Sequence, residues 1–267
     1  MTVVAATLVT RAMTSRGKAR RMVERNVVAY RSGWFVFISG LFEPVFYMFS
    51  LGIGLGSLVG TVSVDGREVP YAAFVAPAML AVSAMNGSLT ETTFNMFGRL
   101  KYQRLYDAIL ATPMRPVDIA LGEIAWALAR GSIYSAAFLG LMAALGYVPS
   151  WYGVLALPAA VLIGYAFGAV GMAFATFMRS WQHFDYLGFA IMVLFLLSAT
   201  FYPLDVYPSW VRPVVGWTPL TQSVELVREL TTGDLSASTL VHVAYLLVLS
   251  VAGSAAATHR IDRLLCR

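Results

Sequence analysis

Apolar runs long enough to cross a bilayer alternate with short polar segments along most of this chain. A membrane-spanning helix needs about 20 apolar residues, whereas a strand of a membrane barrel alternates over about 10. The pattern therefore predicts an all-α integral membrane protein with six transmembrane helices. The expected spans are residues 33–59, 71–97, 119–145, 153–178, 186–202 and 240–258.

The longest polar interruption between the first runs covers residues 98–123. Leucine and isoleucine recur on one face of its first half, with Lys101 and Asp107 off that face, which predicts a short helix. Pro113 and Pro116 then stop a continuous helix, so a tight turn follows. A short helix held between two spans suits docking on a soluble partner. A solvated linker with no partner is the alternative.

The N-terminal residues 1–32 carry seven Arg or Lys residues and one acidic residue, Glu24. Valines among these charges predict an amphipathic helix on the membrane surface, ahead of a transmembrane domain at 33–258. A disordered basic tail that only fixes orientation is the alternative. We expect no cleavable signal peptide, because no apolar core follows the first basic residues at once. A second basic tail occupies 259–267.

The segment after the fifth run, residues 203–233, is apolar but broken by four prolines. Its pieces are too short to span a membrane, and its tryptophans favour the membrane interface. We therefore expect re-entrant or interfacial helices there. Residues 220–230 predict a short amphipathic helix with Glu225, Arg228 and Glu229 facing water.

Glycines recur within two of the apolar runs. Small residues allow helices to approach closely in lipid, so both runs predict close packing. The glycines concerned are Gly52, Gly54, Gly56 and Gly60 in the first run and Gly164, Gly168 and Gly171 in the fourth.

Composition supports the membrane assignment. Of 267 residues, 58% are hydrophobic and 12% are charged, about half the charge of a soluble domain. The single cysteine, Cys266, allows no internal disulfide. Fifteen Lys or Arg residues fall on the side of both termini and three on the other, so both termini are expected in the cytoplasm, in the cell membrane. The net charge of +5 thus reflects topology and does not indicate nucleic-acid binding.

Four ionisable residues lie within or near the spans: Glu43, Glu91, Glu123 and Arg130. Charges at such depths usually face protein or water. Glu43 and Arg130 are at matching depths from the cytoplasmic side, which suggests a contact between them. Glu91 and Glu123 are expected at the wet cytoplasmic ends of their spans.

The sequence offers no catalytic constellation. It has no Walker loop for ATP, no His/Cys cluster for a metal and no serine in a nucleophile elbow. We therefore expect no enzyme activity and no cofactor on this chain. A transporter without an energy-supplying site of its own would need a partner that supplies energy. An intramembrane lipid-modifying enzyme and a passive channel are the alternatives.

Two stretches resemble a known family. LYDAILATPMRPVDIALGEIAWALARG (105–131) is similar to the cytoplasmic loop of ABC-2 type exporter permeases, which have the type V exporter fold. SATFYPLDVYPSWVRPVVGWTPLTQSVELVRELTTG (198–233) is similar to the C-terminal part of that family. FEPVFYMFSLGIGLG (42–56) resembles the branch that includes nodulation lipo-oligosaccharide exporters and daunorubicin-type drug exporters.

The resemblance implies roles for particular residues. Residues 98–118 would be the coupling loop to an ATPase and 203–233 the outer re-entrant hairpin, with 1–32 as the interfacial connecting helix. The implied coupling residues are Leu105, Tyr106, Asp107, Leu110, Thr112, Pro113, Arg115 and Asp118. The implied gate residues are Phe201, Tyr202, Pro203, Leu204, Pro208, Trp210 and Pro219.

The resemblance also implies an assembly and a class of substrate. Two permeases, here expected to be identical, would join two ABC ATPase subunits that carry ATP and Mg. The exporter would move an amphiphilic molecule, a lipid-linked saccharide or a hydrophobic drug, out of the cytoplasm or the inner leaflet. The short first outer loop departs from family members that have a large extracellular domain.

Overall fold

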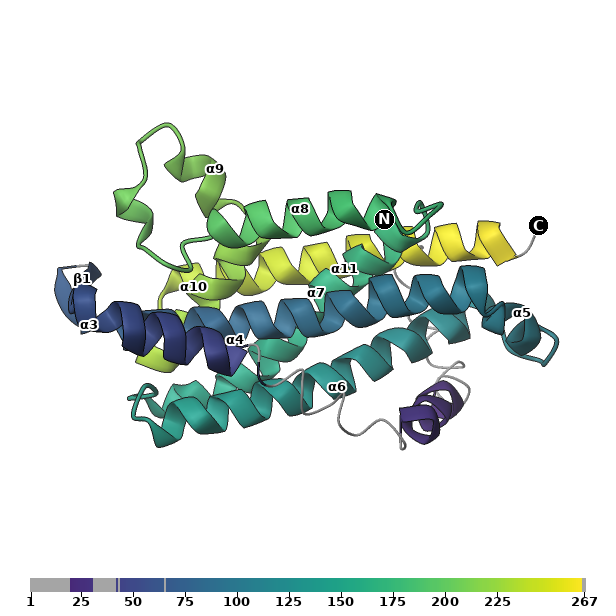
Figure 1. The fold of residues 1–267 in the computed structure, drawn as a ribbon, viewed down its shortest axis with the longest axis horizontal. Coiled ribbons are helices and arrows are strands. Elements are labelled where there is room, and N and C mark those ends of the chain that lie inside the picture. The colour runs from purple at the N-terminus through teal and green to yellow at the C-terminus, as the bar shows by residue number, and fades with distance from the viewer. Residues whose placement is uncertain (1–19, 31–41, 43, 65, 266–267) are drawn as a thin grey trace.

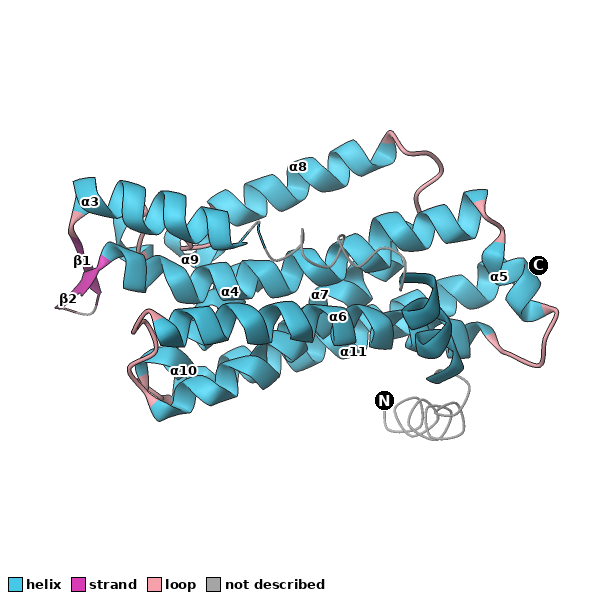
Figure 2. Ribbon diagram, turned by 60° about the horizontal axis from the view of Figure 1, so that its bottom comes forward, coloured by secondary structure: helices cyan, strands magenta, loops and turns pink. Residues whose placement is uncertain are grey.

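The computed structural model describes residues 20–30, 42, 44–64 and 66–265 and has the form of an elongated helical bundle (Figures 1 and 2). Residues 20–30 are helical, and so is Pro44–Val59, whose last turn is α3 (Gly56–Val59). The other elements are β1 (Thr61–Val64), β2 (Arg67–Pro70), α4 (Tyr71–Thr90), α5 (Leu105–Leu110), α6 (Pro116–Ala144), α7 (Ala156–Ala175), α8 (His183–Leu196), α9 (Arg212–Gly216), α10 (Pro219–Thr232) and α11 (Ala237–Leu265).

Four of these helices are long and apolar enough to cross a membrane. α4 continues through two π-helical segments to Tyr102, which makes one helix of 32 residues. A 3₁₀ turn precedes α7, and together they run from Trp151 to Ala175. With α6 and α11, these are helices at the positions of four expected spans, each long and apolar enough to cross a bilayer.

The first and fifth apolar runs form shorter helices among the described residues. α8 has 14 residues, about 21 Å of helix, whereas a bilayer core is about 30 Å thick. The prediction that this helix reaches residue 202 is wrong, because the chain turns at Ala199, where φ is 52°. The first run is described from Pro44 onward, and residues 31–41 lie outside the described part.

The core of the bundle surrounds α4. Helices α6, α7 and α10 pack against it, and α11 packs along α7. Figure 1 shows α4 running through the middle of the molecule. In its most apolar stretch, 78% of the residues are buried within the chain, against 22% for α11. α4 is therefore the helix that positions the others.

The two ends of the bundle carry different elements. α5 and the C-terminal end of α11 lie at one end, and the strands, α9 and the C-terminal end of α10 lie at the other (Figure 1). The strands β1 and β2 form an antiparallel hairpin in which Val62 pairs with Val69. This arrangement agrees with the expectation that the C-terminus and the loop at 98–118 share one side of the membrane.

Glycines allow α7 to approach α4 closely, as the sequence predicts for α7, and allow α11 to approach α7. A Cβ atom added to Gly171 would come within 2.6 Å of the Leu89 side chain on α4. One added to Gly253 of α11 would come within 2.8 Å of the backbone nitrogen of Val170. Backbone cannot move aside as a side chain can, so the α7–α11 contact depends on this glycine.

Gly253→Ala is expected to lower the free energy of unfolding by about 1–3 kcal/mol, because the added methyl group overpacks a backbone contact. Gly140→Ala in α6 is the matched control, since no atom lies within 4 Å of an added Cβ there. The midpoint of thermal unfolding in detergent measures both. Equal midpoints for the two variants would contradict the close α7–α11 contact.

Candidate functional site

A cluster of buried charges lies at the end of the bundle that carries α5. It is held by α4, α6, α5 and the helix of residues 20–30. The charge cluster consists of Glu91, Arg99, Glu123 and Arg130, and its polar neighbours are Arg25, Asn26, Tyr30, Asn95, Tyr106 and Tyr134.

Arg99 is at the centre of the charge cluster. Its Nη2 lies 2.7 Å from Glu91 Oε1, and its Nη1 pairs with Glu123. Nη1 of Arg130 lies 2.9 Å from the other carboxylate oxygen of Glu91, Oε2. The two arginines and two carboxylates alternate, so the cluster is close to neutral and each charge has an opposite partner.

Two expectations from the sequence are wrong here. Glu91 and Glu123 do not lie at wet helix ends, since each residue is 1% exposed. Arg99 was expected in the polar segment beyond a span that ends at residue 97, but the helix of α4 continues through Gly98–Tyr102 and leaves Arg99 8% exposed. Glu91 and Arg99 lie on one continuous helix, but Glu123 and Arg130 come from α6, so the sequence pattern alone could not reveal the cluster.

The helix of residues 20–30 contributes one wall of the charge cluster. Arg25 Nη2 lies 3.5 Å from Glu123, and Asn26 donates to the same carboxylate at 3.3 Å. Tyr30 donates to Glu91 at 3.4 Å. Burial and the nearby Glu91 carboxylate raise the pKa of Tyr30, which keeps its hydroxyl protonated as a donor. The residues described here are helical as predicted, and they attach to the spans through polar contacts.

Tyr106 joins α5 to the charge cluster. Its hydroxyl donates to Glu123 Oε1 at 3.1 Å, and its side chain is 1% exposed. Burial and the Glu123 carboxylate raise the pKa of Tyr106 well above its usual value, so it donates throughout the physiological pH range. The preceding residue Arg104 has φ 46°, which separates α5 from the helix of α4.

The turn after α5 is fixed by a capping box. The Arg115 backbone N–H donates to Asp118 Oδ2 at 3.0 Å, and Pro116 occupies the first turn of α6. The resemblance implies that Asp118 belongs to the turn that holds α5, and the buried Asp118 carboxylate closes this turn. Tyr106 is also buried, so it faces the bundle and does not offer a surface to a partner. Leu105 and Leu110 are half-buried. The remaining implied coupling residues, Asp107, Thr112, Pro113 and Arg115, are exposed.

The suggested contact between Glu43 and Arg130 stays a prediction, because Glu43 lies outside the described residues. The guanidinium of Arg130 pairs with Glu91 and donates from Nε to the Tyr134 hydroxyl at 2.9 Å. It also lies 5.6 Å from the centroid of the Tyr30 ring.

An aromatic cluster that sequence reasoning missed holds the start of α8 against the same end of α4. The Trp181 ring lies 5.1 Å from Phe97 and stacks on Tyr102 at 5.7 Å. Phe184, the one buried residue of α8, lies 4.5 Å from Phe94. The aromatic residues at 94, 97 and 102 are the sequence signal that could have predicted this cluster. Their partners, Trp181 and Phe184, lie about 80 residues further along the chain, so the pattern alone does not pair them.

The residues implied as an outer gate lie at the opposite end of the bundle, in or near irregular chain. Most are exposed or half-buried, and Trp210 is 79% exposed. The expected amphipathic helix is present as α10, but Arg228 does not face water. It lies 4.0 Å from the centroid of the Phe74 ring and donates to the Ala199 carbonyl at 3.2 Å. The residues implied as an outer gate are Phe201, Tyr202, Pro203, Leu204, Pro208, Trp210 and Pro219.

Comparison with known proteins identifies the family. The profile of the family "ABC-2 type transporter" matches residues 18–231, most of the chain. This chain belongs to the ABC-2 type transporter family. It is therefore a multi-pass membrane protein of a transporter, and the resemblance noted on the two sequence stretches is confirmed.

Several proteins named Nodulation protein J are similar over most of their length. The protein from Rhizobium leguminosarum bv. trifolii is 36% identical over 227 residues, 84% of this chain and 85% of that protein. The protein from Rhizobium leguminosarum bv. viciae is 35% identical over 247 residues, covering 91% and 93%. The protein from Rhizobium meliloti (strain 1021) is 36% identical over 222 residues, covering 82% and 81%.

Arg99→Met is expected to lower the free energy of unfolding of this ABC-2 protein by about 3–5 kcal/mol, because two buried carboxylates lose their shared partner. Arg20→Met is the matched control, since the Arg20–Glu24 pair is exposed and such pairs contribute about 1 kcal/mol or less. Thermal unfolding in detergent measures the difference. A midpoint shift no larger than that of the control would contradict a central role for Arg99.

Proposed function

We propose that this chain is the permease subunit of an ATP-driven exporter for an amphiphilic substrate. One observation carries the proposal: Tyr106 ties the short helix α5 to Glu123, and Arg99 ties Glu123 to Glu91. A displacement of α5 therefore acts on α4 and α6 together. A helix anchored in this way suits the transmission of force from a soluble partner into the membrane.

The part of α5 offered to that partner is its exposed side. Asp107 and Ala108 are exposed on α5, and the turn adds Ala111, Thr112 and Pro113. The buried side carries the anchor, Tyr106, so docking and anchoring use opposite faces of one short helix. We infer that an ABC ATPase binds this exposed face and supplies ATP and Mg, since the sequence has no Walker loop of its own.

Two copies of this chain are proposed to complete the exporter with two ATPase subunits. The weak attachment of α8 supports a second copy, because one residue of this helix is buried within the described chain. Its apolar side chains Tyr186, Phe189 and Met192 are at least half exposed. In a membrane they face lipid or another helix, and a second copy would supply that helix.

The first experiment is co-purification of this chain with a candidate ABC ATPase, followed by ATPase assays in lipid. A complex of two permeases and two ATPases with substrate-stimulated hydrolysis is expected. A chain that purifies alone and binds no ATPase would instead favour a passive channel or an intramembrane enzyme.

Ala108→Trp is expected to reduce complex formation with the ATPase at least about tenfold, because a bulky side chain would stand on the proposed docking face. Ala136→Trp is the control, since Ala136 is exposed on α6 within the span. Size-exclusion chromatography of the two variants with the ATPase measures the difference. Equal complex formation would remove α5 as the docking element.

A further inference from the structure

The loop between α7 and α8, residues 176–182, contacts both α11 and α4 toward the end of the bundle that carries α5 (Figure 2). The guanidinium carbon of Arg260, in the last two turns of α11, lies 3.9 Å from the centroid of the Phe177 ring. Further along the loop, Trp181 stacks on Tyr102 with ring centroids 5.7 Å apart. The loop therefore joins a cation on one neighbouring helix to an aromatic ring on another.

This loop is at the depth where the membrane core ends. α7 has 20 residues, about 30 Å of helix, and the hydrocarbon core of a bilayer is about 30 Å thick. Phe177 and Trp181 come shortly after the end of α7, and both are exposed. Exposed aromatic side chains collect at the boundary between the hydrocarbon core and the lipid headgroups. We therefore expect the loop to lie at the level of the headgroups.

The arginines at this loop have no acidic partner among the described residues. Arg260 Nε is buried and has no hydrogen-bond acceptor there. Arg179, two residues beyond Phe177, is exposed. Asp185 in the first turn of α8 pairs with neither arginine. The arginines of the charge cluster are neutralised by carboxylates of the chain, whereas these two remain available to an anion from outside it.

Exposed apolar side chains continue from this loop along the sides of the bundle. Phe174, one turn before Phe177 on α7, is exposed, and so is Phe189 on α8. With the loop at headgroup level, these rings would lie beside the acyl chains of the bilayer. A soluble protein could reach the arginines, but it could not reach phenylalanines within the hydrocarbon core. The combination of free cations and adjoining apolar rings therefore favours a lipid over a soluble partner.

We propose that the loop between α7 and α8 and the end of α11 form a site for an anionic phospholipid, here called the lipid site. The phosphate lies between the two arginines, and the acyl chains follow the exposed phenylalanines of α7 and α8. Arginine suits a phosphate because its N–H groups form a planar fork of donors. Basic pockets between transmembrane helices commonly bind anionic headgroups. The residues of the lipid site are Phe177, Arg179, Trp181 and Arg260.

The test uses the full purified chain in detergent and native mass spectrometry, which resolves the number of bound lipids. Phosphatidylglycerol is the anionic probe, and phosphatidylcholine with the same acyl chains is the zwitterionic comparison. We expect the first phosphatidylglycerol to bind at least about tenfold more tightly than phosphatidylcholine, because two cations face its headgroup. Excess inorganic phosphate is expected to leave the lipid bound, since it lacks acyl chains.

Three variants address the arginines of the lipid site. Arg179→Gln and Arg260→Gln are each expected to weaken phosphatidylglycerol binding about fivefold, the effect of one cation near an anionic headgroup, and to leave phosphatidylcholine binding unchanged. Arg260→Lys keeps the charge and is expected to retain most of the affinity. Because Arg179 is exposed, its substitution leaves the packing of the bundle intact.

Arg67→Gln is the matched control for the loss of charge. Arg67 is exposed at the opposite end of the bundle, where it lies 3.1 Å from Asp234. This variant removes the same charge from the chain and is expected to bind phosphatidylglycerol as tightly as the unmodified protein.

Each outcome decides the inference. Equal affinity for the two lipids, unchanged affinity in both glutamine variants, or displacement by inorganic phosphate would overturn it. Loss of ATPase binding by Arg179→Gln without added lipid would also overturn it, because the arginines would then belong to a protein interface. The inference does not rest on the proposed export function, and no ATPase is present in the lipid measurement. A negative result there leaves the proposed function standing.

Discussion

Arg99 holds Glu91 and Glu123, two carboxylates from different helices, in a part of the chain from which water is largely excluded. A buried charge without a partner is strongly destabilising, so each of these groups requires the others. The ends of α4 and α6 are therefore fixed relative to one another by charge as well as by packing. The helix of residues 20–30 and α5 then attach to the same carboxylates, so four segments share one polar centre.

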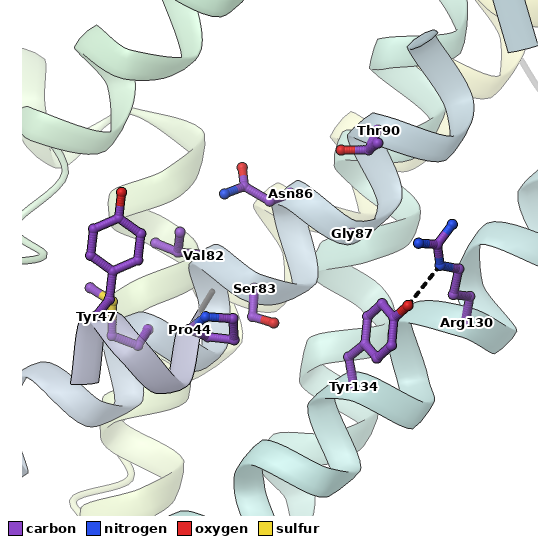
Figure 3. A pocket seen from close by; sticks show the side chains of 10 residues that line it. Pro44, Tyr47, Val82, Ser83, Asn86, Gly87, Thr90, Arg130 and Tyr134 are labelled. Atoms are coloured by element: carbon purple, nitrogen blue, oxygen red, sulfur yellow. Dashed lines mark hydrogen bonds between the residues drawn. The ribbon is translucent and has the colours of Figure 1, made fainter. Parts of the chain in front are cut away.

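This shared centre connects the proposed docking helix to a cavity between the first apolar helix, α4 and α6 (Figure 3). Tyr106 contacts Glu123 at one end of the charge cluster, and Arg130 at the other end lines this cavity. The path between them runs through Arg99 and Glu91. A movement of α5 would change the hydrogen bonds available to Arg130, so the same side chains that stabilise the bundle are suited to report events at α5 to the cavity.

Sequence reasoning located the main elements but misjudged several side chains. It found four helices long enough to span, the short helix α5, the turn at Pro113 and Pro116, and the glycine face on α7. Each depends on local pattern or backbone chemistry. It placed Glu91, Glu123 and Arg228 in water, because charged residues near helix ends usually lie there. Glu123 pairs with Arg99 and Arg25 from other segments, which periodicity does not bring together. Arg228 is buried because it packs on the Phe74 ring of α4.

The sequence by itself determined that this chain crosses a membrane and where its helices are interrupted, because apolar length and proline act locally. The side of the membrane that its basic segments favour stays a prediction from charge asymmetry. The tertiary structure decided which charges are neutralised, that α8 ends at Leu196 and that Tyr106 anchors α5 from the inside. It also decided that Tyr47, Val82 and Asn86 border two cavities, one toward α6 and one toward α8. These features depend on which helices pack together, and that choice is made by shape and charge complementarity between segments far apart in the chain.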